Sequence, residues 1–226
     1  MCPFCYIGKR KFEKALQEFP QRERIDVEWK SYELMPHLEP GKVQDLQQML
    51  VETKGMDMEQ VKTMNARVAN AGEQVGIEFN FEKALAVNTR MAHRLIHFAK
   101  AHGKQHEAEE LLFHSFFTQG KNVGDLDTLL EVGKELGLDS EAVKAALEQG
   151  SYEEDVERDI YEARQVGVRG VPFFVMNRKY AVSGAQEAQS FLQVLEKSFG
   201  EWEKENPVPA LQVIEGKSCS SDGTCD

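Results

Sequence analysis

Two cysteines stand at the start of the chain, Cys2 and Cys5, with Pro3 and Phe4 between them. On a helix, residues three apart share a face about one turn apart, so their sulfurs can meet without movement of the backbone. At a helix N-terminus the macrodipole and the free N–H groups favour a thiolate, which lowers the pKa of a cysteine from about 8.5 to roughly 3.5–7.5. Pro3 sets φ for the first turn, and Phe4 supplies apolar cover. We therefore predict a redox pair in which Cys2 is the reactive thiolate and Cys5 is the resolving thiol.

Two other interpretations of this pair stay open. A Cys-x-x-Cys sequence can be half of a zinc site, which needs two more ligands at matching spacing. It can also be two buried cysteines that act as small hydrophobic side chains. No second pair with zinc-knuckle spacing lies nearby, and this favours the redox interpretation. His93 and His97 lie one turn apart without a third ligand, so we expect a helix face there and predict no metal site.

A second pair of cysteines, Cys219 and Cys225, lies in a tail rich in serine and glycine. One hypothesis is a second dithiol that exchanges with the first through a mixed disulfide. The alternatives are incidental cysteines in a disordered tail, or zinc held by the two pairs together. The residues alone leave these three open.

Length and composition restrict the class of protein. With 226 residues the chain can bury a proper core in one large domain or two small ones. Its net charge of −11 argues against a nucleic-acid partner, because phosphate binding needs a basic surface. No apolar run approaches the roughly 20 residues that span a bilayer and no signal-peptide pattern is present, so we expect a cytoplasmic protein that binds no membrane. Cysteines confined to the two ends do not suit a disulfide-stapled secreted scaffold.

Hydrophobic periodicity predicts an α/β chain with a long helical stretch in its middle. A helix over 3–19 ends at Pro20, and alternation over 25–32 predicts a strand. Between 43 and 150 we expect helices and no convincing strand. A further helix, an apolar strand, its hairpin partner and a closing helix complete the pattern. The predicted ranges after the first strand are 44–54, 58–76, 88–103, 107–118, 125–136 and 140–149 for the helical stretch, with Ser140 as an N-cap, then 152–165, 171–177, 180–182 and 185–199.

Pro172 lies at the mouth of the apolar strand, which we expect to be buried on both faces. Proline cannot donate to a strand ladder, so it is confined to strand starts, edges and bulges. Pro172 either begins the strand or forms a cis bond with Val171. In the cis case the backbone of Val171 would face outward beside the thiols, where its N–H and C=O could bind an extended substrate segment.

Taken together, these features resemble the DsbA family of thioredoxin-fold oxidoreductases, and more narrowly its FrnE-like cytoplasmic branch. The resemblance covers roughly residues 1–200. It implies a thioredoxin fold with a large all-helical insertion, a nucleophilic Cys2, a resolving Cys5 and a cis Val171–Pro172 bond facing them. The stretches that carry it are Cys-Pro-Phe-Cys-Tyr-Ile-Gly-Lys-Arg from Cys2, Asn-Thr-Arg-Met-Ala-His-Arg-Leu from Asn88, Val-Arg-Gly-Val-Pro-Phe-Phe-Val from Val168 and Tyr-Ala-Val-Ser-Gly-Ala-Gln from Tyr180.

The resemblance also sets the expected division of the chain. We expect the first part of the thioredoxin fold over 1–42, the helical insertion over 43–150, the second part over 151–204 and a flexible tail over 205–226. In a thioredoxin fold a strand leads into the Cys-x-x-Cys helix, and only Met1 precedes Cys2 here. We therefore expect the first strand to be missing from this chain, and a natural start about ten residues earlier.

We predict a thiol–disulfide oxidoreductase or isomerase that acts on protein or peptide disulfides. Catalysis is assigned to Cys2, Cys5 and Pro172, and substrate binding to Val171, Pro3 and Phe4. No cofactor is expected beyond the thiols, with glutathione as a candidate reductant, and the oligomeric state stays open. Two rivals remain. One is a glutathione-dependent isomerase of the 2-hydroxychromene-2-carboxylate type, a branch that places serine where Cys2 stands. The other is a zinc-binding chaperone without enzymatic activity.

Overall fold

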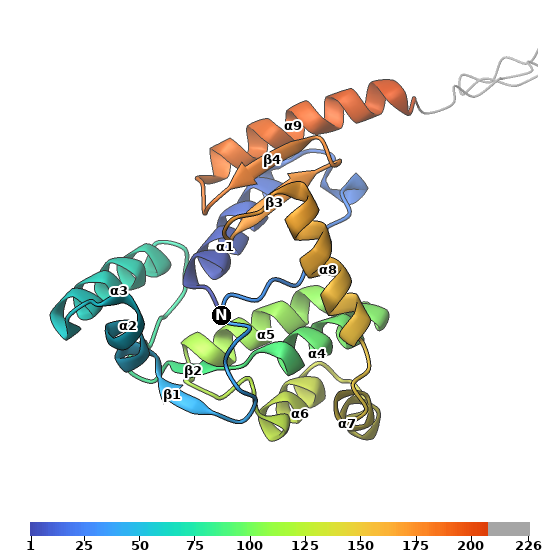
Figure 1. The fold of residues 1–226 in the computed structure, drawn as a ribbon. Coiled ribbons are helices and arrows are strands. Elements are labelled where there is room, and N and C mark those ends of the chain that lie inside the picture. The colour runs from blue at the N-terminus through green and yellow to red at the C-terminus, as the bar shows by residue number, and fades with distance from the viewer. Residues whose placement is uncertain (208–226) are drawn as a thin grey trace, which may run out of the picture.

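A computed structural model describes residues 1–207 of the chain, so the cysteines at 219 and 225 lie outside the described part. Helices dominate, and the few strands are short (Figure 1). The helices are α1 (Pro3–Glu18), the 3-10 turn η1 (Arg22–Arg24), α2 (Leu46–Lys54), α3 (Met58–Glu73), α4 (Arg90–Ala101), α5 (Gln105–Phe117), α6 (Leu126–Glu135), α7 (Ser140–Glu148), α8 (Glu153–Val166) and α9 (Ala188–Glu205). The strands are β1 (Val43–Asp45), β2 (Leu85–Val87), β3 (Phe173–Met176) and β4 (Tyr180–Ser183).

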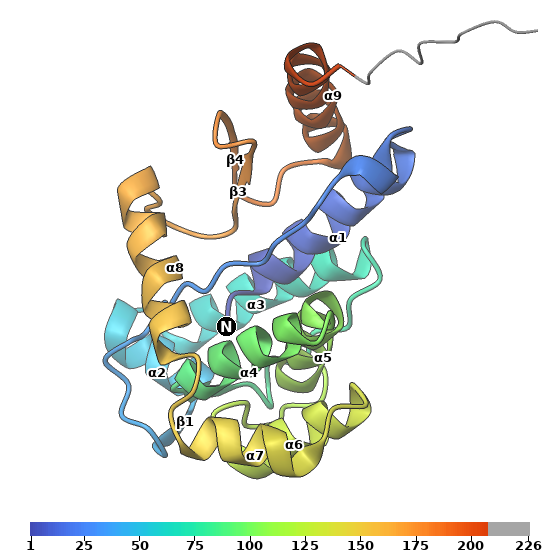
Figure 2. The same cartoon turned by 90° about the vertical axis from the view of Figure 1, so that its right-hand side faces the viewer.

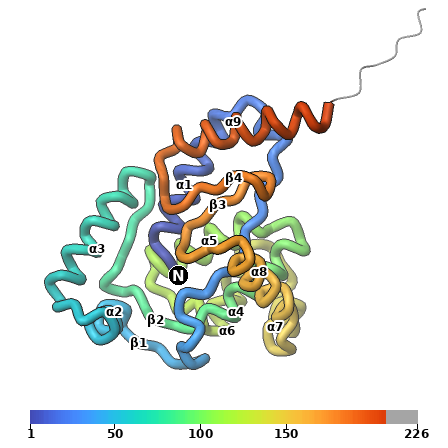
Figure 3. Tube along the Cα trace, turned by 45° about the horizontal axis from the view of Figure 1, so that its top comes forward, coloured from blue at the N-terminus to red at the C-terminus, as the bar shows by residue number. Residues whose placement is uncertain are grey.

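Within residues 1–207 the side chains form two hydrophobic cores, and α1 contributes to both. Tyr6 and Ile7 from its first half lie in the larger core, which is built from the helices between 58 and 147. Phe12, Ala15 and the adjoining Phe19 lie in a smaller core with α9 and the β3–β4 hairpin. The hairpin and α9 therefore form one layer beside the helical block, and α8 links the two (Figure 2). The start of the chain lies where the layers meet (Figure 3).

The β3–β4 hairpin closes through a tight turn, as the sequence predicts. Asn177 and Arg178 adopt left-handed φ of 50° and 56°, and the N–H of Lys179 donates to the carbonyl of Met176 at 3.0 Å to close the turn. The prediction that β3 is buried on both faces is wrong, because the side chain of Val175 is 44% exposed. Phe174 and Met176 pack on the smaller core, whereas Val175 on the opposite face stays exposed among residues 1–207.

The segment 25–32 is extended but forms no strand, contrary to the sequence prediction. A strand requires a neighbouring backbone edge, and side chains take that place here. Gln105 of α5 accepts a hydrogen bond from the N–H of Trp29 at 3.1 Å and donates one to its carbonyl at 2.8 Å. Asp159 of α8 accepts from the N–H of Ser31 at 2.8 Å. Alternation in the sequence therefore identified an extended chain but not its partners.

The helical block contains one short antiparallel pair that the sequence did not predict. β1 and β2 pair Val43 with Val87 and Asp45 with Leu85. With three residues each, these strands are too short to show alternation. A second difference concerns α7, where the N-cap is Asp139 and not Ser140: the Asp139 carboxylate accepts from the N–H of Ala142 at 2.8 Å.

Candidate active site

Cys2 and Cys5 lie at the first turn of α1, with two free thiols that are each half-buried. Cys2 is the N-cap, with extended φ and ψ of −116° and 121°, and Pro3 takes the first helical position. The N–H of Cys5 donates to the carbonyl of Cys2 at 3.1 Å. The helix therefore begins where the sequence predicts, and its first turn brings both sulfurs to the same face.

The two thiols have opposite pKa shifts. A hydrogen bond from the Cys5 side chain, helped by the backbone N–H groups of Cys5 and Phe4, outweighs burial and lowers the pKa of Cys2 to about 6. The same hydrogen bond to the Cys2 thiolate, together with burial, raises the pKa of Cys5 strongly. At neutral pH Cys2 is therefore a thiolate and Cys5 a protonated thiol. Disulfide exchange requires this difference, because the thiolate attacks and the thiol resolves the mixed disulfide.

The turn before β3 lies against the thiols. The Cys2 sulfur lies 3.8 Å from the carbonyl oxygen of Val171, and the Val171–Pro172 peptide bond is cis. The carbonyl of Pro172 accepts from the N–H of Gly184 at 2.8 Å, which ties this turn to the end of β4. Val171 and Pro172 thus lie beside the thiols, although they are far from them in the sequence.

Gly8 makes this contact sterically feasible and was missed from the sequence. A Cβ at Gly8 would lie 3.0 Å from Cγ of Pro172 and 3.4 Å from the Phe174 ring. A helix interior disfavours glycine by roughly 1 kcal/mol relative to alanine, so a glycine one turn after the cysteines was itself a signal. It marks the point where the turn before β3 approaches α1.

A cavity of about 860 Å³ opens beside the thiols. Met1, Cys2, Cys5, Val171 and Pro172 line one part of it. The extended segment 24–35 forms one side and residues 173–178 another. Pro3 and Phe4 do not line the cavity, and Phe4 is 47% exposed on the outer surface. Any role of Phe4 in binding a substrate would therefore lie outside this cavity.

Among the titratable side chains that line the same cavity, His93 and Glu109 are partly or fully buried and lack a hydrogen-bonded partner within residues 1–207, and the sequence gives no sign of a role for either. His93 of α4 has a buried Nδ1 without a hydrogen-bond partner, and burial lowers its pKa to about 3. Glu109 of α5 is buried at 9% exposure, and this burial raises its pKa to about 7. The neighbouring His97 lies 3.1 Å from Asp159 and 3.2 Å from the Ser31 hydroxyl, so the histidine pair is not arranged as metal ligands. Within residues 1–207 no group of three metal-binding side chains is found.

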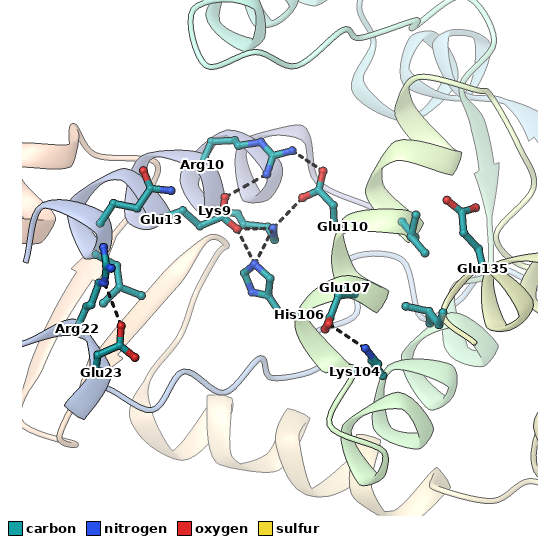
Figure 4. Close-up of a pocket in the computed structure, with 14 residues that line it drawn as sticks. Lys9, Arg10, Glu13, Arg22, Glu23, Lys104, His106, Glu107, Glu110 and Glu135 are labelled. Atoms are coloured by element: carbon teal, nitrogen blue, oxygen red, sulfur yellow. Dashed lines mark hydrogen bonds and ion pairs between the residues drawn. The ribbon is translucent and has the colours of Figure 1, made fainter. Parts of the chain in front are cut away.

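Charged residues that follow Cys5 by one to two turns fix α1 to α5 (Figure 4). Lys9 is 1% exposed, bonds Glu110 at 2.7 Å and contacts Glu13. Tyr6 donates to Glu110 at 2.6 Å, and His106 lies 2.9 Å from Glu13. Although burial opposes it, hydrogen bonds from His106 and Lys9 lower the pKa of Glu13 to about 2. The cluster therefore holds the first turns of α1, and the thiols with them, against the helical block.

No helix in the described part is both long and apolar enough to cross a membrane.

The chain is 32% identical over 182 residues to the uncharacterized protein YwbO of Bacillus subtilis, and this match covers 78% of this chain and 82% of that protein. The crystal structure of a probable DsbA oxidoreductase, SCO1869 of Streptomyces coelicolor, is similar with a TM-score of 0.85 and 35% identity over 100% of this chain and 94% of that one.

A more distant structure is that of a 2-hydroxychromene-2-carboxylate isomerase, with a TM-score of 0.61 and 17% identity over 91% of this chain and 93% of that one. At this identity the likeness shows a shared fold alone. The model of the DSBA-like thioredoxin domain matches residues 1–196. The fold is thus the thioredoxin fold with a helical insertion that the sequence predicts, and the chain belongs to the family of DSBA-like thioredoxin domains.

Proposed function

We propose that the protein is a thiol–disulfide oxidoreductase that acts on protein or peptide disulfides through Cys2 and Cys5. The observation that carries the proposal is geometric: two free thiols share the first turn of α1, and the Cys2 sulfur lies 3.8 Å from the carbonyl oxygen of Val171 at the mouth of a cavity. The lowered pKa of Cys2 agrees with its role as the attacking thiolate. Membership of an oxidoreductase family supports the same conclusion.

The reaction starts from the reduced pair. The Cys2 thiolate attacks one sulfur of a substrate disulfide, so that a Cys2–substrate bond forms and the other substrate sulfur leaves as a thiolate. Cys5 then loses its proton and attacks the Cys2 sulfur. The Cys2–Cys5 disulfide forms, and the second substrate sulfur leaves as a thiolate. The substrate has gained two electrons and the enzyme has lost them; the reverse sequence oxidises a dithiol.

Substrate positioning is assigned to the turn before β3. The carbonyl of Val171 lies beside the Cys2 sulfur, and within residues 1–207 no hydrogen bond is made by the N–H of Val171. An extended peptide could pair with both groups as an added strand. The exposed Phe4 offers apolar contact on the other side of Cys2. In this scheme Pro172 shapes the turn, and Pro3 and Phe4 border the bound peptide.

The proposal also covers the location of the protein in the cell and its source of electrons. We place the protein in the cytoplasm, with glutathione as candidate reductant and no cofactor beyond the thiols. Cys219 and Cys225 are proposed as a second dithiol that exchanges with the first pair. Their structure lies outside the described residues, so this part is tested with the full chain and a variant that ends at 207.

The test is the equilibrium of the protein with glutathione buffers, followed by thiol trapping and mass spectrometry. A defined two-electron equilibrium that disappears in Cys2→Ser supports the proposal. A potential near about −270 mV indicates a reductase or isomerase, and one near about −120 mV an oxidant. A shift on removal of the tail supports exchange with Cys219 and Cys225. Absence of a reversible disulfide contradicts the proposal, and stoichiometric zinc or glutathione-dependent isomerisation that survives Cys2→Ser would favour the rivals.

A further inference from the structure

Glu109 differs from the other buried acid of the described residues in having no partner of its own. Asp159 is also buried, but it lies 3.1 Å from both Lys30 and His97 and accepts from the backbone of Ser31 at 2.8 Å. No hydrogen bond or ion pair within residues 1–207 reaches the carboxyl group of Glu109. Burial of an unpaired carboxylate is costly, so its presence in the cavity that the two thiols line calls for a chemical role.

The position of Glu109 is fixed by the residues that follow it on α5. Phe113, one turn later, stacks on the ring of Tyr6 at 4.9 Å between centroids. The adjacent Glu110 binds Lys9 and Tyr6 of α1. These contacts hold α5 against the helical turn that carries Cys5, and Glu109 lines the same cavity as Cys5. The negative charge of Glu109 reaches Cys5 and contributes to the raised pKa of that thiol.

We propose that Glu109 accepts the proton of the Cys5 thiol, directly or through one water, when Cys5 resolves the mixed disulfide. The inference rests on the proposed function. In the mixed disulfide the Cys2 sulfur is bonded to a substrate sulfur. The Cys5 S–H gives its proton to the Glu109 carboxylate, the Cys5 sulfur attacks the Cys2 sulfur, and the substrate leaves as a thiolate. The proton on Glu109 then passes to that thiolate or to water, so Glu109 is restored.

The electrostatic surroundings suit this role. Burial raises the pKa of Glu109 to about 7, against the opposing effect of Lys9 and His106, while Glu110 raises it further. The cavity is also lined by the Met1 amino group, by Cys2 and Cys5 at the start of α1 and by the neutral His93 on α4. Its other charged lining residues are Arg24, Asp26, Glu28 and Lys30 of the segment 24–35, Asp159 and Glu162 of α8, and Arg178. A group with a pKa near the working pH is an effective base, because a large share of it is ionised while it still binds a proton well. An ordinary surface carboxylate would hold the proton far less readily.

The kinetic test uses the full chain with Glu109→Gln, which keeps the shape of the side chain and removes its titratable carboxyl group. We expect resolution of a preformed mixed disulfide to slow about 100-fold at neutral pH, the lower end of what general acid–base catalysis contributes. The rise of the resolution rate with pH near 7 should vanish, while alkylation of the Cys2 thiolate continues. Glu109→Asp should restore part of this rise. The matched control is Glu107→Gln, an exposed acid on the same helix, which should leave the profile unchanged.

A second measurement separates this inference from the proposed function because it needs no substrate. Thiolate absorbance gives the titration of Cys5 in a Cys2→Ala background, with and without Glu109→Gln. We expect removal of the acid to lower the pKa of Cys5, since the two groups share a buried site. An unchanged titration, or an unchanged pH profile of resolution, overturns the inference. If the wild-type protein exchanges no disulfide, the proposed function fails and the proton-transfer step fails with it, even where the titration shows the coupling.

Discussion

The Cys2 sulfur lies 3.8 Å from the carbonyl oxygen of Val171, although 169 positions separate the two residues along the chain. This contact joins the first turn of α1 to the turn before β3. It places a low-pKa thiolate next to backbone groups that can hold an extended peptide. The consequences can be tested one residue at a time.

Replacement of each cysteine should separate attack from resolution. Cys2→Ser should abolish disulfide exchange, because a hydroxyl does not attack a disulfide at neutral pH. Cys5→Ser should keep the first step and accumulate a mixed disulfide that is visible by intact-mass measurement. Equal reactivity of both single variants toward a model disulfide would contradict the assignment of Cys2 as the attacking thiol.

The reactivity of Cys2 should follow its lowered pKa. Alkylation of the reduced protein should rise with pH around a midpoint of about 6 and level off above it. Because the folded-state pKa lies below the value of an unfolded thiol, the thiolate stabilises the reduced fold above the unfolded pKa, near 8.5. That contribution is lost as the pH falls toward 6. The raised pKa of Cys5 acts in the opposite direction at alkaline pH, so the Cys5→Ser variant gives the cleaner measurement.

Gly8→Ala should disturb the site through contact alone. The new Cβ would lie 3.0 Å from Pro172, so the turn before β3 must shift, at a cost of roughly 1–3 kcal/mol in the free energy of unfolding. We expect a slower exchange rate together with this loss. Gly200→Ala in α9 is the matched control, because a Cβ there meets nothing within 4 Å and should stabilise the helix slightly. Urea unfolding and exchange kinetics on both variants check the pair, and equal effects would refute the contact argument.

Lys9→Met should destabilise the fold. It removes the ammonium group that binds Glu13 and Glu110, so that Arg10 alone still pairs with both carboxylates. We expect a loss of about 3 kcal/mol, at the lower end for a broken buried ion pair because both carboxylates keep some solvent. Lys14→Met, an exposed lysine on the same helix, should be nearly neutral. Similar losses in both variants, measured by urea unfolding, would show that the cluster contributes little.

The features that the sequence predicts well are local. Cys2 and Cys5 share a helical face because of their spacing, and the turn at Asn177 is indicated by an asparagine, which tolerates positive φ. Alternation predicts a strand over 25–32, because it cannot reveal that the side chains of Gln105 and Asp159 bind the backbone of this extended segment. Glu109 could not be recognised for a related reason. On α5 it is one acid among several, and only the packing of Phe113 on Tyr6 brings it to the cavity beside Cys5.

Helix α1 contributes side chains to both hydrophobic cores, and this determines how the protein denatures. Because Tyr6 and Ile7 belong to one core and Phe12 and Ala15 to the other, neither core can melt without removing support from the other half of the same helix. The two layers are thus coupled through α1, the helix that begins at the two cysteines. Loss of thiol reactivity and loss of helical circular dichroism should then follow one shared melting curve, so the activity of the site reports on the integrity of the whole fold.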